Sequence, residues 1–310
     1  MWTHLKLGEI KRKLLEDHAI KVCRNTVRRL LYRAGYKRRS LSKCIATGSY
    51  AKRNEQFELI FELIKVVQKM KCPIISIDTK KKERLGNLYR SGKFYSNQPV
   101  KVFDHDYPNL AEGKVIPYGI YDMTKNKGFM SIGVSHETAE FIGNAILWWW
   151  DGYGIHDYPD ATNILIICDS GGANGYRKHV FKKVLQSISS TIGKEIIVCH
   201  YPPYCSKWNP IEHKMFPHVH AAMEGVVFSS YQIVKELIEK TYTQQGLRVI
   251  ARIDYNEYDI GIKTKAEDVD QNRIVFCKNS PNLCYTIFFK KMSYLLFAYS
   301  LLKCGLFFLC

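Results

Sequence analysis

The chain has 310 residues, 46% hydrophobic and 24% charged, a composition that supports a folded core and excludes global disorder. Its 46 Lys and Arg residues outnumber its 29 Asp and Glu residues, and the net charge of +17 favours a polyanionic partner, nucleic acid before an anionic membrane. The ten Cys residues form no Cys-x-x-Cys pair, and no secretory signal is recognised at Met1, so we expect a reducing cytoplasm rather than a disulfide scaffold.

The positive charge is concentrated near the N-terminus. Residues 1–60 carry 15 Lys or Arg against 5 Asp or Glu, which gives this fifth of the chain +10 of the net charge. Apolar residues recur at helical spacing from Leu5 to Leu15, and a second helical pattern runs from about Cys23 to Ala34. We therefore expect a small all-α module over residues 1–45, with a tight turn between two helices.

The second predicted helix has a polar and basic face. A short helix, a tight turn and a helix of this kind form the helix-turn-helix plan, which places such residues against base edges and phosphates. The alternative is a basic helical hairpin that only keeps the chain soluble. The residues expected to bind DNA are on this helix and just after it: Arg24, Asn25, Thr26, Arg28, Arg29, Lys37, Arg38 and Arg39.

A connector helix is expected within residues 46–70, and the following part alternates between strands and helices. Its order is three strands, helix, strand, helix, strand, helix, which is the ribonuclease-H-like arrangement of a mixed sheet flanked by helices, here over residues 71–250. Residues 251–287 are expected to be a C-terminal extension. The predicted strands are Pro73–Asp78, Ile116–Tyr121, Phe129–Val134, Asn163–Asp169 and Glu195–His200, and the helices are Thr138–Trp150, Tyr176–Ser189 and a last one from about Pro210.

Three carboxylates occupy the ends of these elements. Asp78 ends the first strand, Asp169 ends the fourth strand, and Glu212 begins the last helix. The first and fourth strands are neighbours in this fold, so the three side chains can converge at one edge of the sheet. Taken singly, each has a plainer interpretation as a turn former or a helix cap. The other candidates, Asp106, Asp122 and Asp157, are interpreted as surface or turn residues.

Converging carboxylates repel one another unless cations neutralise them. Hard oxygen ligands suit Mg²⁺ or Mn²⁺, and two such ions can stabilise both the attacking and the leaving oxygen of a phosphodiester. We therefore predict that Asp78, Asp169 and Glu212 bind two ions and are catalytic. Lys80, Lys81 and Lys82 follow Asp78 directly, and we expect them to contact phosphates of the cleaved strand rather than form an ordinary solvated charge run.

Several motifs in order carry a family resemblance over roughly residues 5–287. The segment Tyr201–His213 looks like the proline-turn-to-glutamate segment of DDE transposases, including the mariner-like superfamily. Four further stretches narrow the resemblance to one family, the Rhodopirellula-type DDE transposases of bacterial insertion sequences. These stretches are residues 76–83, 116–122, 138–141 and 168–175. By position, Asp78, Asp169 and Glu212 correspond to the metal-binding triad of that family.

The resemblance implies DNA strand cleavage at element ends and strand transfer into target DNA. The implied partner is double-stranded DNA, bound by a homodimer or higher oligomer, and the implied location is the cytoplasm, with the nucleoid. Two alternatives stay open: a ribonuclease-H-like nuclease or resolvase that cleaves without strand transfer, and an inactive remnant that only binds DNA. The remnant hypothesis has two sources, because the chain starts within what looks like the last helix-turn-helix of longer family members and ends in an atypical tail.

That tail, residues 288–310, is rich in Phe, Leu and Tyr and lies beyond the family pattern. A membrane anchor is one interpretation, but the uncharged run 292–302 is only 11 residues long, short of the ~20 that a spanning helix needs. No stable membrane association is therefore expected.

Other motifs are weaker. Cys199, His200, Cys205 and His213 lie close together in sequence, but their spacing fits no standard zinc module. Ser170 lacks a Gly-x-Ser-x-Gly context, so a hydrolase nucleophile is not predicted. Of Trp148, Trp149 and Trp150, one or two are expected in the core, since consecutive helical residues cannot all face one way.

Overall fold

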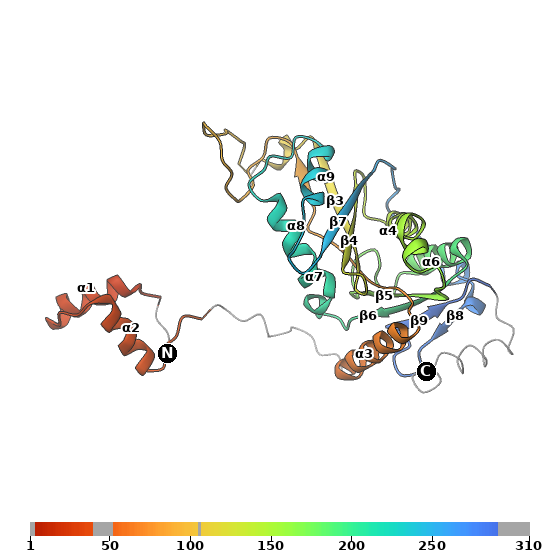
Figure 1. Cartoon of the computed structure of the whole chain (residues 1–310), viewed down its shortest axis with the longest axis horizontal. Coiled ribbons are helices and arrows are strands. Elements are labelled where there is room, and N and C mark those ends of the chain that lie inside the picture. Colours follow the sequence, from red (N-terminus) through yellow and green to blue (C-terminus); the bar gives the residue numbers. More distant parts are fainter. Residues whose placement is uncertain (1–3, 40–51, 105–106, 291–310) are drawn as a thin grey trace. The chain divides into compact units, whose positions relative to one another are not determined.

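The computed structural model describes residues 4–39, 52–104 and 107–290, and the chain divides into two compact units, residues 1–47 and 48–310. The smaller unit contains α1 (Leu7–His18) and α2 (Arg24–Arg33), which pack against each other (Figure 1). Val27 of α2 is buried, whereas Leu30 is 49% exposed. Two short helices bury little surface, so Val27 is the only buried residue of α1 and α2.

The larger unit is built on a mixed sheet that has nine strands among the described residues, in the order β7-β4-β3-β1-β5-β6-β9-β8, with β2 paired to β3. The strands are β1 (Ile74–Thr79), β2 (Glu83–Leu85), β3 (Gly113–Asp122), β4 (Lys127–Gly133), β5 (Asn163–Cys168), β6 (Glu195–His200), β7 (Arg248–Asp254), β8 (Ile274–Phe276) and β9 (Cys284–Ile287).

The five central strands confirm the ribonuclease-H-like topology. Strand β3 runs antiparallel to both β1 and β4, and β5 runs parallel to both β1 and β6. The wholly buried residues of β5 explain its central place, since a strand covered on both faces carries no polar alternation. In the β1–β5 register Ser76 is opposite Ile167, so Asp78 and Asp169 follow at the same edge of the sheet.

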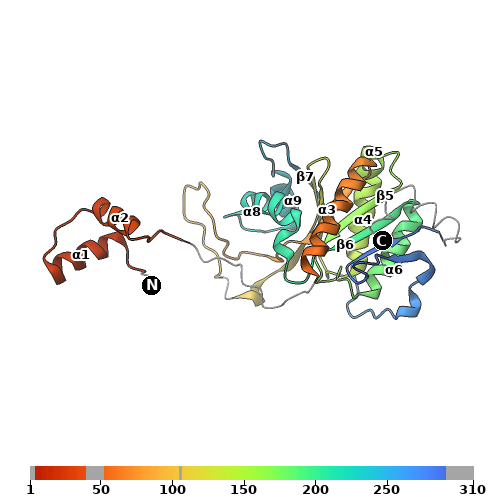
Figure 2. The ribbon, with the colours of Figure 1, turned by 90° about the horizontal axis from the view of Figure 1, so that it is seen from below.

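Helices cover both faces of this sheet. The ring of Phe141 packs on Tyr118, whereas the next residue, Gly119, faces Ile211 and Phe216, so α4 and the α7–α8 pair lie on opposite faces. Figures 1 and 2 show α4 and α6 side by side on the face opposite α3. The helices of this unit are α3 (Arg53–Lys69), α4 (Ala139–Trp149), α5 (Ile155–Asp157), α6 (His179–Ile192), α7 (Pro210–Lys214), α8 (Phe216–Met223) and α9 (Tyr231–Glu239).

The structure adds elements that the sequence did not predict. Strands β2, β7, β8 and β9 were missed, and the segment expected as an extension, 251–287, contributes most of β7 together with β8 and β9. Strands β2, β8 and β9 have only three or four residues, too few positions for an alternating pattern to be recognised. Trp149 and Trp150 are buried and Trp148 is half-buried, as expected for consecutive helical positions.

The apolar tail lies outside the described residues from position 291 onward, and so does the run 292–302. Among the residues that are described, no helix combines the length and apolar character needed to cross a membrane.

Candidate active site

Asp78 stands where β1 leaves the sheet. Its side chain is half-buried, and its Oδ1 accepts a hydrogen bond of 2.8 Å from the backbone amide of Thr79. The strand before it is buried from Ile74 to Ile77 and apolar except for Ser76, so the chain places a carboxylate at the point where a buried strand meets solvent.

Asp169 directly follows the neighbouring strand, β5. The half-buried Asp169 accepts a hydrogen bond from the amide of Gly171, in the loop that leads to α6. Its backbone carbonyl is fixed by His200 at the end of β6, whose Nδ1 donates a hydrogen bond of 2.8 Å. The following loop therefore holds the carboxylate of Asp169, and the next strand holds its backbone.

Glu212 is brought to the same edge by a buried connection between α7 and β1. The Ser76 hydroxyl donates to Asn209 Oδ1 over 2.5 Å, and Asn209 Nδ2 donates to the Ile77 carbonyl over 3.1 Å. The Ile211 amide in turn donates to the Ser76 hydroxyl. Asn209 is fully buried, and Pro210 begins the helix at a position where a missing amide hydrogen costs nothing. The first turn of α7, with Glu212, is thus fastened beside Asp78.

The three carboxylates act on one another electrostatically. Burial raises the pKa of Asp78 to about 8, and the negative charges of Asp169 and Glu212 add to this rise. The pKa of Asp169 is raised by burial first, and then by Glu137 and Glu212. Like charges have this effect only over a limited range, so Asp169 and Glu212 lie within electrostatic reach of Asp78.

The donor set fits a hard divalent cation, although it is not a closed cage. Among the described residues, no three His, Cys, Asp or Glu side chains already converge tightly enough to hold an ion. However, Asp78, Asp169 and Glu212 are in no ion pair within the described part of the chain, and their pooled negative charge contributes to the raised pKa of Asp78. Oxygen donors with uncompensated charge suit Mg²⁺ or Mn²⁺.

Glu137 is a fourth carboxylate at this edge, and the sequence analysis missed it. Its Oε1 accepts a hydrogen bond of 2.8 Å from the Thr79 hydroxyl, and its Oε2 forms an ion pair of 2.8 Å with Lys82. Glu137 also raises the pKa of Asp169. The available signal was the acidic residue just beyond the end of β4, at the strand ends that point toward the triad.

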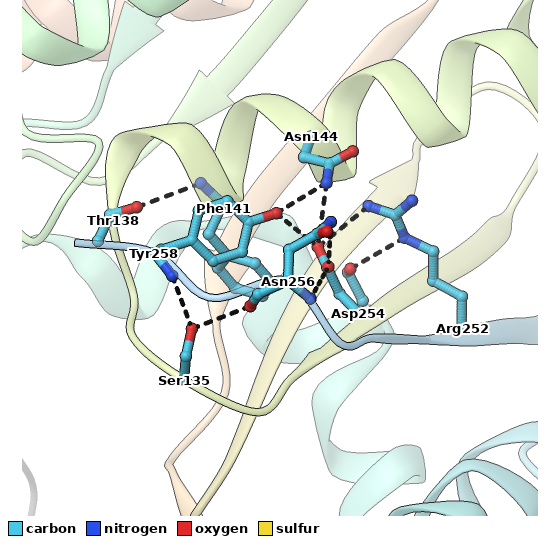
Figure 3. A network of polar contacts seen from close by, with 9 residues as sticks. Ser135, Thr138, Phe141, Asn144, Arg252, Asp254, Asn256 and Tyr258 are labelled. Atoms are coloured by element: carbon cyan, nitrogen blue, oxygen red, sulfur yellow. Dashed lines mark hydrogen bonds and ion pairs between the residues drawn. The ribbon is translucent and has the colours of Figure 1, made fainter.

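A polar network anchors the segment that carries Glu137. Figure 3 shows Asp254, at the end of β7, accepting hydrogen bonds from Asn144 of α4 and from Asn256 and Tyr258. Ser135 bonds to the backbone of the same returning segment, through the carbonyl of Asn256 and the amide of Tyr258. The end of β7 therefore holds the β4–α4 loop in place.

The lysine run after Asp78 divides into three different environments. Lys80 is buried and pairs with Glu83 at 3.3 Å, which corrects the expectation that it contacts DNA, because its ammonium group has little exposed surface to offer. Lys81 is exposed, and Lys82, paired with Glu137, keeps 47% of its side chain exposed. Lys81 and Lys82 are the two that a DNA strand can reach.

Two of the three competing carboxylates have structural partners. Asp122 is buried rather than on the surface, yet it is the predicted turn residue, since it accepts hydrogen bonds from the amides of Thr124 and Lys125 and from Tyr158. Asp157 pairs with Lys127. Asp106 lies outside the described residues.

The two His residues considered for zinc have other contacts. His200 Nδ1 is used by the Asp169 carbonyl, and its imidazole is fully buried, which lowers its pKa to about 4. His213 Nε2 contacts the Lys207 carbonyl. His200 is therefore a neutral group that supports the Asp169 backbone.

The predicted DNA-binding residues of the smaller unit are on its surface, with one exception. Thr26 is half-buried, and its hydroxyl lies 3.2 Å from Cys23 Sγ, which also accepts the Thr26 amide at the start of α2. Thr26 is thus occupied in capping the helix. The exposed residues are Arg24, Asn25, Arg28, Arg29, Lys37, Arg38 and Arg39.

Fold and site together define a class: a ribonuclease-H-like protein with acidic residues gathered at the carboxyl edge of its central strands. The chain matches the family described as "Rhodopirellula transposase DDE domain" over residues 1–288. It therefore belongs to that family of DDE transposases, as the motifs predicted.

Two other comparisons complete this picture. No curated protein matches the chain. Among solved structures, the chain is similar to the Mos1 transposase paired-end complex with left transposon end, with 14% identity, 77% of this chain and 71% of that chain covered, and a TM-score of 0.45. It is also similar to the Mos1 strand transfer complex, with 13% identity, the same coverage of both chains and a TM-score of 0.43.

Proposed function

We propose that this chain is a transposase that cleaves DNA at the ends of an insertion sequence and joins the freed strand to target DNA. The observation that carries the proposal is the shared electrostatic site of Asp78, Asp169 and Glu212, from β1, β5 and α7, in a chain of the DDE transposase family. These residues are the proposed catalytic groups.

Asp78, Asp169 and Glu212 would hold two Mg²⁺ or Mn²⁺ ions, which when bound supply Lewis-acid stabilisation of the attacking and leaving oxygens. The chain's own groups do the positioning. The hydrogen bonds of Asn209 and Ser76 hold Glu212 beside Asp78, and His200 holds the backbone of Asp169. Lys81 and Lys82 offer positive charge to strand phosphates, while α2 supplies the proposed contact with element ends.

The test is Glu212→Gln, which keeps the size of the side chain and removes one negative charge. We expect cleavage of an element-end duplex to fall by roughly 100-fold or more, because even groups that only orient a metal ligand contribute 10–100-fold. Binding of the same duplex in a gel-shift assay should be unchanged or tighter. The matched control is Glu58→Gln on the exposed surface of α3, which should cleave like the wild type.

The products separate this proposal from its alternatives. A 3′-hydroxyl oligonucleotide joined to a plasmid supports transposition, whereas cleavage without joining would indicate a nuclease or resolvase. Binding without any cleavage by the wild type would indicate a remnant. Equal cleavage by Glu212→Gln and the wild type would remove Glu212 from the site.

A further inference from the structure

A cavity opens near the start of α6 and is not part of the carboxylate site. It has a volume of about 290 Å³. Its walls come from two separate segments, the loop and first turn of α6 on one side and the β8–β9 region on the other. Tyr176, Arg177, His179 and Lys182 line it on the α6 side, and Phe276 and Asn282 line it on the β8–β9 side.

The cavity is lined by basic groups and by no carboxylate. Within the described chain, Arg177, His179 and Lys182 form no ion pair with any Asp or Glu. They surround the N-terminus of α6, which has no acidic residue in its first turn and no capping side chain, so the helix dipole adds to the positive potential. The cavity therefore attracts an anion.

One polar atom at the cavity lacks a partner. His179 Nδ1 is buried and has no hydrogen-bond partner among the described residues. A buried polar atom left unpaired is costly, and because His179 is only half-buried, a turn of its imidazole ring would offer this atom to a ligand in the cavity. A phosphate bound beside His179 would also interact favourably with the positive charges of Arg177 and Lys182.

The cavity also has aromatic walls. Phe276 is 39% exposed, and the Lys182 ammonium lies 5.4 Å from the centroids of both Phe276 and Tyr285. On the other side, the Arg177 guanidinium lies 5.1 Å from the Tyr176 ring. Basic side chains interleaved with exposed aromatic rings are the features that bind the phosphates and bases of single strands. The volume is too small for a duplex.

The cavity is close to the proposed catalytic edge. Tyr176 follows Asp169 by seven residues along one loop. The ring of His200 lies 6.2 Å from that of Tyr176 and 5.9 Å from that of Tyr285, and the same imidazole donates to the Asp169 carbonyl. One imidazole thus connects the wall of the cavity to the backbone of a triad residue.

We propose that this cavity binds one unstacked nucleotide of the DNA strand that crosses the Asp78, Asp169 and Glu212 site, with its phosphate at Arg177, His179 and Lys182 and its base against Tyr176 and Phe276. The inference rests on the proposed function, since it takes its substrate to be a DNA strand at that edge.

The experiment measures binding of a 12-nucleotide single strand that carries one 2-aminopurine, with EDTA present so that cleavage does not enter. We expect Lys182→Gln and Phe276→Leu each to weaken binding by at least about fivefold, in line with the loss of one stacked base. The rise in 2-aminopurine fluorescence on binding should be lost in Phe276→Leu. The matched control is Lys183→Gln, which removes the same charge from the next, exposed residue of α6 and should change affinity less than about twofold.

Equal affinity of Phe276→Leu and the wild type would overturn the proposal, and so would equal weakening by Lys182→Gln and Lys183→Gln, which would indicate diffuse charge attraction. Competition by inorganic phosphate as strong as by deoxynucleoside monophosphate would also overturn it. Melting temperatures check that each variant is folded. Cleavage by the wild type with no effect of the cavity variants would refute only this inference, whereas cavity-dependent binding without cleavage would refute only the proposed function.

Discussion

At the scale of single residues, Asn209 connects the last catalytic candidate to the first. Asn209 stands three residues before Glu212, and its fully buried amide bonds to the Ser76 hydroxyl and to the Ile77 carbonyl. Ile77 directly precedes Asp78, so the amide links the two candidates. An amide serves here because it can accept from one group and donate to the other at once. A carboxylate in its place could not donate to the carbonyl.

We expect Asn209→Ala to lower the free energy of unfolding by about 2–4 kcal/mol, because two buried polar groups lose their partner. Cleavage should fall further than folding explains, since Glu212 loses its anchor, while DNA affinity is retained. Urea denaturation, cleavage and gel shift on the same preparation measure these effects. The control is Asn54→Ala on the exposed side of α3, and equal stability of both variants would contradict the role of Asn209.

His200 gives the protein a defined response to acid. Burial lowers its pKa from 6.5 to about 4, so between these values the unfolded chain binds a proton that the folded chain does not. Stability from this residue is complete above pH 6.5 and is lost as the pH falls toward 4, by up to about 3 kcal/mol. His200→Asn should remove this contribution, so the slope of unfolding free energy against pH should fall by about 1.4 kcal/mol per pH unit relative to the wild type, whereas the exposed control His156→Asn should leave the slope unchanged. An unchanged slope in His200→Asn would refute this origin.

At the scale of elements, α2 combines one buried residue with an exposed basic face. Val27 anchors the helix, while Arg24, Arg28 and Arg29 remain exposed. Replacing these three with Ala should weaken DNA binding and reduce the slope of log K against log salt by roughly 0.9 for each DNA phosphate that the variant no longer neutralises. Binding titrations from low to high salt measure the slope.

The control for this prediction removes the same charge from the other helix of the unit. Lys11, Arg12 and Lys13 of α1 are also exposed, and their replacement with Ala should change the slope less. If both triple variants lower the slope equally, α2 has no special place in DNA binding and the unit attracts DNA by its total charge.

At the scale of the whole molecule, the triad makes stability depend on both pH and metal. Without metal, the pKa of Asp78 is about 8 in the folded chain, so between about pH 4 and 8 the folded chain keeps a proton on Asp78 that the unfolded chain has lost. The free energy of unfolding therefore falls as the pH rises through this range. Added Mg²⁺ should reverse the trend, because protons and cations compete for the same carboxylates.

We therefore expect the rise in melting temperature caused by Mg²⁺ at about 10 mM, a typical saturating level for a weak carboxylate site, to grow between pH 6 and pH 9. Asp78→Asn should abolish most of this increase, and Asp157→Asn, which removes a carboxylate paired with Lys127 outside the triad, should leave it intact. A metal-induced shift that does not vary with pH, or that survives Asp78→Asn, would show that the ion binds elsewhere.

The sequence by itself determined the central strands and the position of Asp78 and Asp169 at the ends of two of them. The apolar run of residues 164–168 predicts a strand without reference to its neighbours, and Asp78 and Asp169 follow such runs where the chain reaches solvent. Only the tertiary structure decided β7 and β8, the outer strands of the sheet, and β9, which lies between β6 and β8. Strands as short as β8 and β9 are stabilised by the pairing that surrounds them and not by their own pattern.

The same division holds for the site. The sequence offered Glu137 as an acidic residue beyond β4, but it did not show that this side chain meets Thr79 and Lys82. The burial of Lys80 and the cavity between α6 and the β8–β9 region likewise depend on segments far apart in the chain. Local patterning determines which residues lie at the ends of strands and helices. The ion pairs, the burial and the cavities follow from long-range packing, which depends on the whole fold.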